Sequence, residues 1–162
     1  MTRIAVISDT HGKSLDVLPQ EIYDEVVAAD IVVHCGDFDR LPLLNQLRQV
    51  SKRFIGVYGN IDSIDIRAEL PQKAVFEVEG KRFGVIHPHW GGPPFGIEQA
   101  IAREFEGVDV ILFGHTHDAC YQTICGVAFL NPGQAYRSFR EPASVGIVTV
   151  GPDGIRADIK SC

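Results

Sequence analysis

Seven side chains of types that bind divalent metal ions follow apolar segments of this sequence. Five apolar runs each lead into Asp, Asn or His at their C-terminal end. A divalent cation needs several oxygen or imidazole ligands that are held rigidly. The candidate ligands are Asp9, His11, Asp37, Asn60, His87, His115 and His117.

Two pairs of these candidates are separated by one residue. In an extended segment alternate side chains point the same way, so Asp9 and His11 form one pair of ligands and His115 and His117 another. A buried strand followed by a polar loop explains any single motif equally well. All five motifs in one order are far more specific, and we expect Asp37 at the centre of the site.

The elements that must position these side chains alternate between strands and helices. Strands are predicted over residues 3–8, 31–35 and 54–58, and apolar spacing predicts helices over 16–29 and 40–50. Such crossovers place strands parallel, and ligands bind beyond their carboxyl ends. Asp9, Asp37 and Asn60 should therefore meet at one edge of a sheet.

The rest of the chain reads mostly as β-structure. Residues 61–73 and 88–96 are expected to be loops, with a helix set by Ile97, Ile101 and Phe105 and a strand over 108–113. Three hairpins are predicted: 74–78 with 81–86, 121–124 with 127–130, and 143–150 with 155–159. The fold class is α/β (α+β), a four-layer αββα sandwich with two mixed sheets face to face.

Composition limits the possible partners and compartments. The chain has 162 residues and a net charge of -6, which fits a single domain over 1–162 and no stable nucleic-acid complex. The four cysteines include no CxxC pair, so we expect reduced thiols, with no functional disulfide between Cys120 and Cys125. Without a visible signal peptide or membrane span, a cytoplasmic location is expected.

The motifs, taken in order, resemble the calcineurin-like metallophosphoesterase superfamily. The resemblance runs from about residue 4 to 133. The start of the chain and the stretch Asn131-Pro132-Gly133 resemble its small prokaryotic phosphodiesterase branch. It implies that Asp9, His11, Asp37 and His117 hold one ion. Asp37 would bridge to a second ion held with Asn60, His87 and His115.

The implied activity is hydrolysis of a small phosphodiester or nucleotide-like substrate. A hydroxide that bridges the two cations would attack phosphorus in line, and the cations would clamp the attacking and leaving oxygens. Asp37, Asn60 and His89 are the predicted catalytic residues, and Asn60 and His89 also contact substrate. Mn²⁺ is the favoured metal, and Fe, Zn²⁺, Ni²⁺ or Co²⁺ would also suit these ligands.

Three positions depart from the family pattern. Ile61 stands where many relatives have a proton-donating His, which predicts weak assistance to poor leaving groups. His89 either replaces that donor in part or, as we favour, shapes the pocket or binds phosphate. Pro88 replaces a usual Gly and fixes the backbone after His87, and Gln134 replaces a usual Ser.

Other residues carry weaker expectations. Asp62 and Asp39 either orient ligands or are exposed loop carboxylates, and His34 is expected to be a satisfied core histidine. Arg137 and Arg140 are expected to be solvated rather than to reach substrate. Trp90 and Phe95 either wall a substrate pocket or form a dimer contact.

Two other functions remain possible from the sequence. A phosphomonoesterase or nucleotidase would use the same metal site. A non-catalytic scaffold, like the retromer subunit that shares the fold, would be favoured if ligands were missing, and none is. A homodimer is a reasonable default for the assembly.

Overall fold

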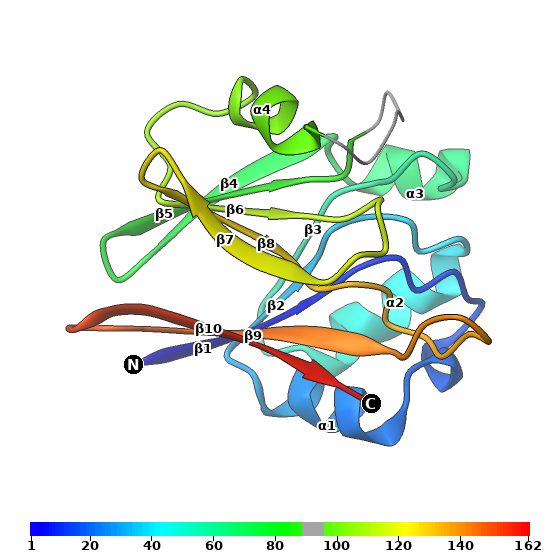
Figure 1. Ribbon diagram of the computed structural model, residues 1–162. Helices are drawn as coiled ribbons and strands as arrows, with labels where there is room; N and C mark the ends of the chain where they lie inside the picture. Colours follow the sequence, from blue (N-terminus) through cyan, green and yellow to red (C-terminus); the bar gives the residue numbers. More distant parts are fainter. Residues whose placement is uncertain (89–95) are drawn as a thin grey trace.

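Two mixed β-sheets form the centre of the fold and pack face to face (Figure 1). The computed structural model describes residues 1–88 and 96–162. The first sheet has the strand order β10-β9-β1-β2-β3, with bounds β1 Thr2–Ile7, β2 Ile31–His34, β3 Phe54–Gly56, β9 Ser144–Gly151 and β10 Gly154–Ser161. The second has the order β4-β5-β6-β8-β7, with bounds β4 Lys73–Val78, β5 Lys81–Ile86, β6 Val110–Phe113, β7 Cys120–Ile124 and β8 Val127–Asn131.

Each sheet combines three parallel strands with two strands that pair in antiparallel fashion. Strands β1, β2 and β3 are parallel neighbours, and β9 and β10 extend that sheet in antiparallel fashion. In the second sheet β5, β6 and β8 are parallel, with β4 and β7 antiparallel at the edges. The parallel crossovers and all three predicted hairpins are confirmed.

The helices lie outside the two sheets, as the αββα prediction requires (Figure 1). Helices α1 (Gln20–Ala28) and α2 (Leu41–Val50) cover the first sheet, and α3 (Ile64–Glu69) lies beside α2. Helix α4 (Ile97–Ala102) covers the second sheet.

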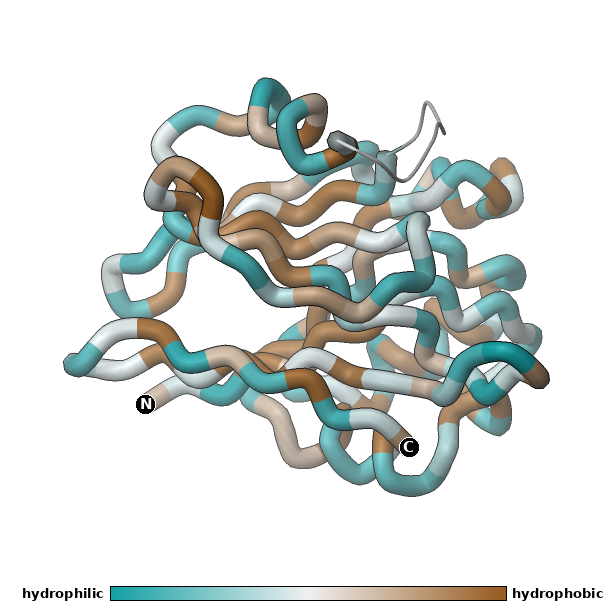
Figure 2. Tube along the Cα trace, in the orientation of Figure 1, coloured by the Kyte–Doolittle hydropathy of each residue, from teal (hydrophilic) through white to brown (hydrophobic). Residues whose placement is uncertain are grey.

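Three apolar layers fill the spaces between these elements, and Figure 2 shows the hydrophobic stretches that follow the strands. The layer between the sheets contains Val6, Val33 and Leu112. Ile22 and Leu44 lie in the layer under α1 and α2, and Ile101 lies in the layer under α4. Strands buried on both faces explain the continuously apolar sequence runs that predicted them.

The start of the first helix differs from the prediction. The segment 16–29 is divided into a short 3-10 helix, η1 (Leu15–Val17), and α1, with Pro19 as the N-cap of α1. Leu18 is extended, with φ -77° and ψ 130°. A residue that precedes proline is disfavoured in the helical region, so the helix cannot continue through Leu18.

The predicted loop over 61–73 was wrong, because it contains α3. This helix has six residues, of which only Ile66 is buried, so its sequence shows no helical period. Helix α4 ends at Ala102, which leaves Phe105 beyond it, packed against the same apolar layer.

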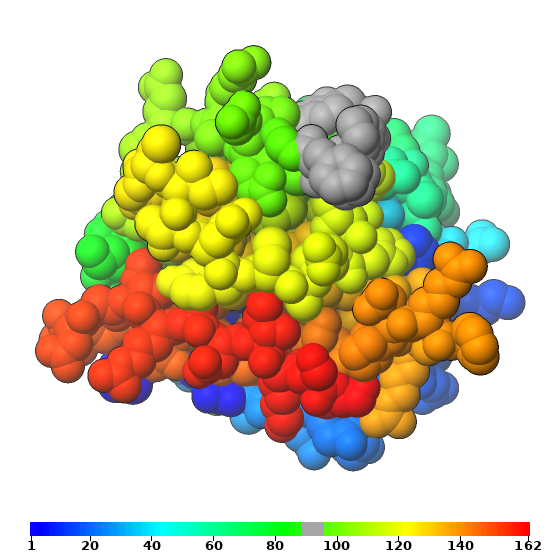
Figure 3. Space-filling view, in the orientation of Figure 1, coloured from blue at the N-terminus to red at the C-terminus, as the bar shows by residue number. Residues whose placement is uncertain are grey.

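Among the described residues, no helix is long and apolar enough to cross a membrane. The segment between β8 and β9 projects from one edge of the molecule, drawn in orange in Figure 3.

Candidate metal centre

The seven predicted ligands follow the carboxyl ends of five strands, three in the first sheet and two in the second. Asp9 and His11 follow β1, Asp37 follows β2, and Asn60 follows β3. From the second sheet, His87 follows β5, and His115 and His117 follow β6. Because the two sheets are stacked, these ends meet at one edge of the sandwich.

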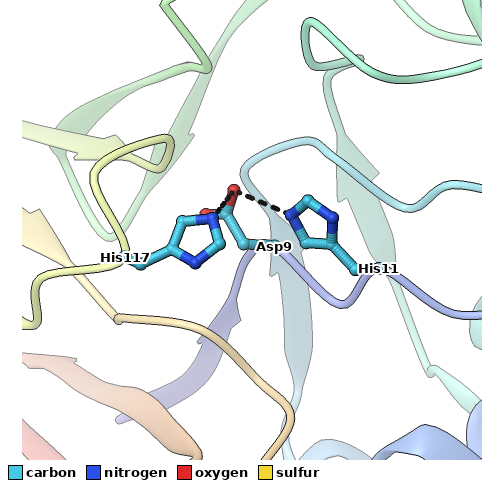
Figure 4. A group of neighbouring side chains, drawn as sticks. All are labelled: Asp9, His11 and His117. Carbon is cyan, nitrogen blue, oxygen red and sulfur yellow. Dashed lines mark ion pairs between the residues drawn. The ribbon is translucent and has the colours of Figure 1, made fainter. Parts of the chain in front are cut away.

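Three of these side chains form what we call the Asp9 group: Asp9, His11 and His117 (Figure 4). Asp9 Oδ1 lies 3.3 Å from His117 Nε2 and 3.7 Å from His11 Nε2. The carboxylate lies between the two imidazoles, and Asp9 is fully buried. Three ligand atoms that converge in this way match the donor set of a divalent cation site.

Two atoms of this group are buried without a hydrogen-bond partner: Asp9 Oδ1 and His11 Nε2. The other carboxylate oxygen of Asp9 is satisfied, since Oδ2 accepts from Ser8 Oγ at 2.7 Å and from the backbone N–H of His115 at 3.1 Å. Buried polar atoms in proteins nearly always have partners. A cation bound between Asp9 Oδ1 and His11 Nε2 would supply the missing partner of both, so these residues fit a metal ion.

The other four ligands form the His87 group: Asp37, Asn60, His87 and His115. His87 Nδ1 donates to the carbonyl of Cys35 at 2.8 Å, which directs His87 Nε2 at Asn60 Oδ1, 2.8 Å away, and at Asp37 Oδ2, 3.2 Å away. His115 Nδ1 lies 3.2 Å from the same Asn60 oxygen. The imidazole–carbonyl bond orients the ring in the way that supports a metal ligand.

Asp37 lies between the two groups. Its Oδ2 is 3.8 Å from His11 Nε2 in the Asp9 group and 3.2 Å from His87 Nε2. Its Oδ1 accepts the backbone N–H of Ile61 at 3.1 Å. Asp9 also approaches both groups, because ligand atoms of Asp9, Asp37 and His87 lie within 4.8 Å of one another. The geometry suits the predicted bridging role of Asp37, which stays a prediction.

In the metal-free protein the carboxylates and the imidazoles of the site shift one another's pKa values. Burial alone would raise the pKa of Asp9, but the close imidazoles of His11 and His117 and the charge of His87 outweigh it and hold the pKa well below its usual range. The contact with Asp9 raises the pKa of His117. For His87, burial acts to lower the pKa, but the contact with Asp37 and the charge of Asp9 outweigh it, so the pKa is raised. In the metal-free protein these shifts favour the anionic form of Asp9 and the protonated forms of His87 and His117.

Five of the seven predicted ligands have a left-handed backbone. Asp9, His11, Asp37, His115 and His117 have φ between 45° and 89°. Each such residue costs about 1 to 3 kcal/mol and persists only when its surroundings impose it, which happens mostly at functional sites. The turns after the strands therefore have a backbone set by the site and not by local preference.

Gly114 allows the β6 turn to approach the β1 turn. A Cβ atom at Gly114 would lie 2.0 Å from Ser8 Oγ and 2.9 Å from Asp9 Oδ2. Any side chain here would displace the hydrogen bond that orients Asp9. The Gly that precedes His115 in the motif thus has a steric reason.

Asp62 and Asp39, which were predicted together as residues that orient ligands, have different roles. Asp62 is buried and accepts backbone N–H groups from Asp37, Gly59 and Asp39 at 2.9, 2.7 and 2.9 Å. The Asp39 side chain is 40% exposed, and its Oδ1 lies 3.7 Å from Nε of the exposed Arg40. For Asp39 the exposed-carboxylate alternative is correct, because only its backbone takes part in the network.

His34 is a satisfied core histidine, as expected. It is fully buried, its Nδ1 accepts the backbone N–H of Gly36 at 3.0 Å, and its Nε2 lies 3.1 Å from Thr10 Oγ1. Its ring stacks on Phe38 with centroids 3.6 Å apart. Burial lowers the pKa of His34 to about 3, so it supports the β1 and β2 turns as a neutral group.

The remaining expectations are decided in part. His87 reaches the site although Pro88 follows it. Arg137 forms an exposed ion pair with Glu21 at 3.6 Å, which matches the solvated alternative, and Arg140 is exposed. The four cysteines are free thiols. His89, Trp90 and Phe95 lie outside the described residues, so the predictions for them stay untested.

Several supporting residues were missed by sequence reasoning. Tyr136 has its ring centroid 5.7 Å from that of His11 and 6.5 Å from that of His117. Arg67 donates to the carbonyls of Asn60 and Asp62, each at 3.0 Å, and so holds the turn that carries Asn60. The Tyr136 contacts join distant segments, whereas Arg67 lies 5 and 7 residues beyond Asp62 and Asn60. No motif in the sequence indicates either set of contacts.

The fold and the site together define the class of protein: an α/β sandwich with a candidate metal centre at the strand ends of both sheets. A family model described as "calcineurin-like phosphoesterase superfamily domain" matches residues 2–153 of the sequence. The chain therefore belongs to this family of metallophosphoesterases. The resemblance expected from the motifs is confirmed.

Known relatives agree with this assignment. A probable metallophosphoesterase of Methanocaldococcus jannaschii is 33% identical over 133 residues, which cover 80% of this chain and 66% of that protein. A phosphodiesterase of the same organism is 29% identical over 163 residues, which cover 90% of this chain and 92% of that protein. The solution structure of a Thermotoga maritima protein superimposes with a TM-score of 0.78 at 34% identity over 100% of both chains.

Proposed function

We propose that this protein is a metal-dependent phosphodiesterase that binds two divalent cations, one in the Asp9 group and one in the His87 group. The observation that carries the proposal is the buried, unpartnered pair of Asp9 Oδ1 and His11 Nε2. These two atoms belong to the turn that follows β1, and one cation would satisfy both at once. All seven predicted ligand positions hold competent ligand types.

The ligand charges favour an anionic substrate. When bound, the cations would supply Lewis acidity and lower the pKa of a coordinated water toward neutrality. Asp9 and Asp37 contribute about -2 against about +4 from two dications, so a net positive field remains. The chain as a whole has a net charge of -6, so attraction of phosphate must be local to this edge of the sheets.

Two observations support a diester over a monoester. The M. jannaschii protein that is 29% identical over most of both chains is named a phosphodiesterase. Ile61 lies beside Asn60 with 42% of its surface exposed and has no proton to give to a leaving group. The chain's own residues thus position phosphate and hold the ligands, while the leaving group must depart with little assistance.

Metal-stripped protein assayed with single dications added back tests this proposal. Mn²⁺, Fe²⁺, Zn²⁺, Ni²⁺ and Co²⁺ would each be tried with an activated aryl phosphodiester and with the matching monoester. We expect restored hydrolysis of the diester, with Mn²⁺ the most effective ion. Faster hydrolysis of the monoester would favour a phosphomonoesterase or nucleotidase.

Two variants complete the design. Asp37→Ala should lose all turnover, and Asp153→Ala, an exposed residue in the β9–β10 turn, should keep wild-type turnover. If no dication restored hydrolysis of either ester, the enzymatic proposal would be wrong and a binding scaffold would be favoured.

A further inference from the structure

Gln134 connects the Asp9 group to the segment that follows it. Its side chain is only 3% exposed, and its Oε1 lies 3.1 Å from His117 Nδ1. The amide oxygen can only accept, so the ring N–H at Nδ1 must donate to it. In the neutral ring, Nε2 is then the nitrogen that keeps the lone pair, and it lies 3.3 Å from Asp9 Oδ1.

The other end of the same side chain holds the segment that we call the 136–141 loop. Gln134 Nε2 donates to the carbonyl of Tyr136 at 2.9 Å and to Ser138 Oγ at 3.1 Å. The loop is closed by two further bonds, from Ser138 N to the Glu141 carbonyl at 3.0 Å and from Glu141 N to Ser138 Oγ at 3.1 Å. Both hydrogens of the Gln134 amide are therefore used to fix this loop.

The 136–141 loop forms a wall beside the Asp9 group. It begins with Tyr136, whose ring faces His11 and His117, and it projects at the edge of the molecule (Figure 3). Tyr136 and Arg137 line a cavity of about 290 Å³ together with residues 16–19. A residue that fixes the loop thus also fixes Tyr136, which lies beside His11 and His117 and lines this cavity.

We propose that Gln134 is a positioning residue that sets the tautomer of His117 through Oε1 and the conformation of the 136–141 loop through Nε2. The inference rests on metal binding by the Asp9 group. One buried amide then couples the orientation of a metal ligand to the wall of the neighbouring cavity. A serine at this position, usual in the resembling branch, has a shorter side chain and could not span both contacts.

Two substitutions separate the two ends of this side chain. Gln134→Glu keeps an acceptor for His117 Nδ1 but cannot donate to the carbonyl of Tyr136. Gln134→Met keeps the volume and removes both contacts. Gln122→Met is the matched control, because Gln122 lies on β7 and its side chain bonds only Glu98 at the surface among the described side-chain hydrogen bonds.

The measurements are Co²⁺ affinity by titration calorimetry, ¹⁵N chemical shifts of the His117 ring, and amide hydrogen exchange of residues 136–141. We expect Gln134→Met to weaken Co²⁺ binding about 10- to 100-fold, the usual effect of removing a partner of a ligating histidine. It should also mix the His117 tautomers and speed exchange in the loop. Gln134→Glu should keep one tautomer and at least wild-type affinity, yet exchange faster in the loop, and Gln122→Met should match wild type throughout.

The outcomes distinguish this inference from the proposed function. Wild-type affinity and a single tautomer in Gln134→Met would overturn the role of Gln134 alone. Wild-type protein that bound no Co²⁺ would overturn metal binding and this inference together. If Gln134→Met does not fold, Gln134→Glu decides the question, because slow loop exchange in that variant would contradict the proposed coupling.

Discussion

The carboxylate of Asp62 accepts the backbone N–H of Asp37 at 2.9 Å, and it does so from a buried position. The same Oδ2 atom accepts Gly59 N at 2.7 Å, and Oδ1 accepts Asp39 N at 2.9 Å. Burial raises the pKa of Asp62, against the lowering effect of these hydrogen bonds. One side chain therefore joins the turns that follow β2 and β3.

Replacing Asp62 should loosen both turns at once. Asp62→Ala leaves three backbone N–H groups without this acceptor, so we expect a loss of unfolding free energy of about 1 to 3 kcal/mol. Metal affinity should fall about 10- to 100-fold, because Asp37 and Asn60 lose their support. Urea unfolding with chelator and Mn²⁺ calorimetry measure the two effects. Asp39→Asn is the control and should change neither quantity, because asparagine also tolerates the positive φ of 89° at this position and the Asp39 side chain is 40% exposed.

The substrate range should depend on Ile61. Wild-type protein is expected to hydrolyse aryl phosphodiesters much faster than alkyl ones, because an alkoxide leaving group needs a proton. Ile61→His should raise turnover of the alkyl diester about 10- to 100-fold and change the aryl rate little, as expected for an added general acid. Ile64→His, at an 82% exposed site on α3, controls for a histidine placed nearby. Equal rates on the two ester types in wild type would contradict the expectation.

The free energy of unfolding should decrease as the pH falls, in part because of His34. Its folded-state pKa is lowered by burial from 6.5 to about 3. Above about pH 6.5 both states hold it neutral, whereas below that pH the unfolded state takes up a proton that the folded state cannot. His34 therefore lowers the free energy of unfolding by up to about 1.4 kcal/mol for each pH unit as the pH falls toward 3.

The variant His34→Gln isolates this contribution. It should be less stable than wild type at pH 7, because it loses the stacking on Phe38. Urea unfolding with chelator from pH 7 to 4.5 should show the gap between the two proteins narrowing as the pH falls. A gap of constant size over that range would show that His34 does not contribute to acid sensitivity.

Metal should stabilise the folded protein. Mn²⁺ at about 100 times its dissociation constant should add about 2.7 kcal/mol to the unfolding free energy, and the melting temperature should rise accordingly. Asp9→Asn removes the anionic ligand of the Asp9 group, so its increase should be clearly smaller. Thermal melts with chelator and with Mn²⁺ measure the difference, and an identical rise in the variant would exclude Asp9 as a ligand.

The sequence was sufficient to predict most strands and the convergence of the site. Apolar runs such as 31–33 are buried on both faces, and parallel strands bring their carboxyl ends together without further information. Helix α3 could not be predicted, since it is short and only Ile66 is buried. The break at Leu18 was accessible in principle from Pro19, because proline restricts the residue before it.

The contacts that support the candidate ligands were harder to predict than the meeting of these residues at one edge of the sandwich. Contacts such as Gln134 with His117 or Tyr136 with His11 join distant segments and depend on side-chain direction. Asp62 and Asp39 look alike in sequence, two loop carboxylates after strands, yet one is buried and the other is exposed. Only the path of the β2 and β3 turns distinguishes them.

The ligands are shared between the two sheets, and this has a consequence for how the protein matures. Asp9 and His11 leave the ribosome long before His117, and neither half of the chain carries a complete set for either group. On the proposed function, cation uptake would follow the docking of the two sheets, because only then are both groups complete. A bound cation would then be held by side chains from both sheets and would oppose their separation during unfolding.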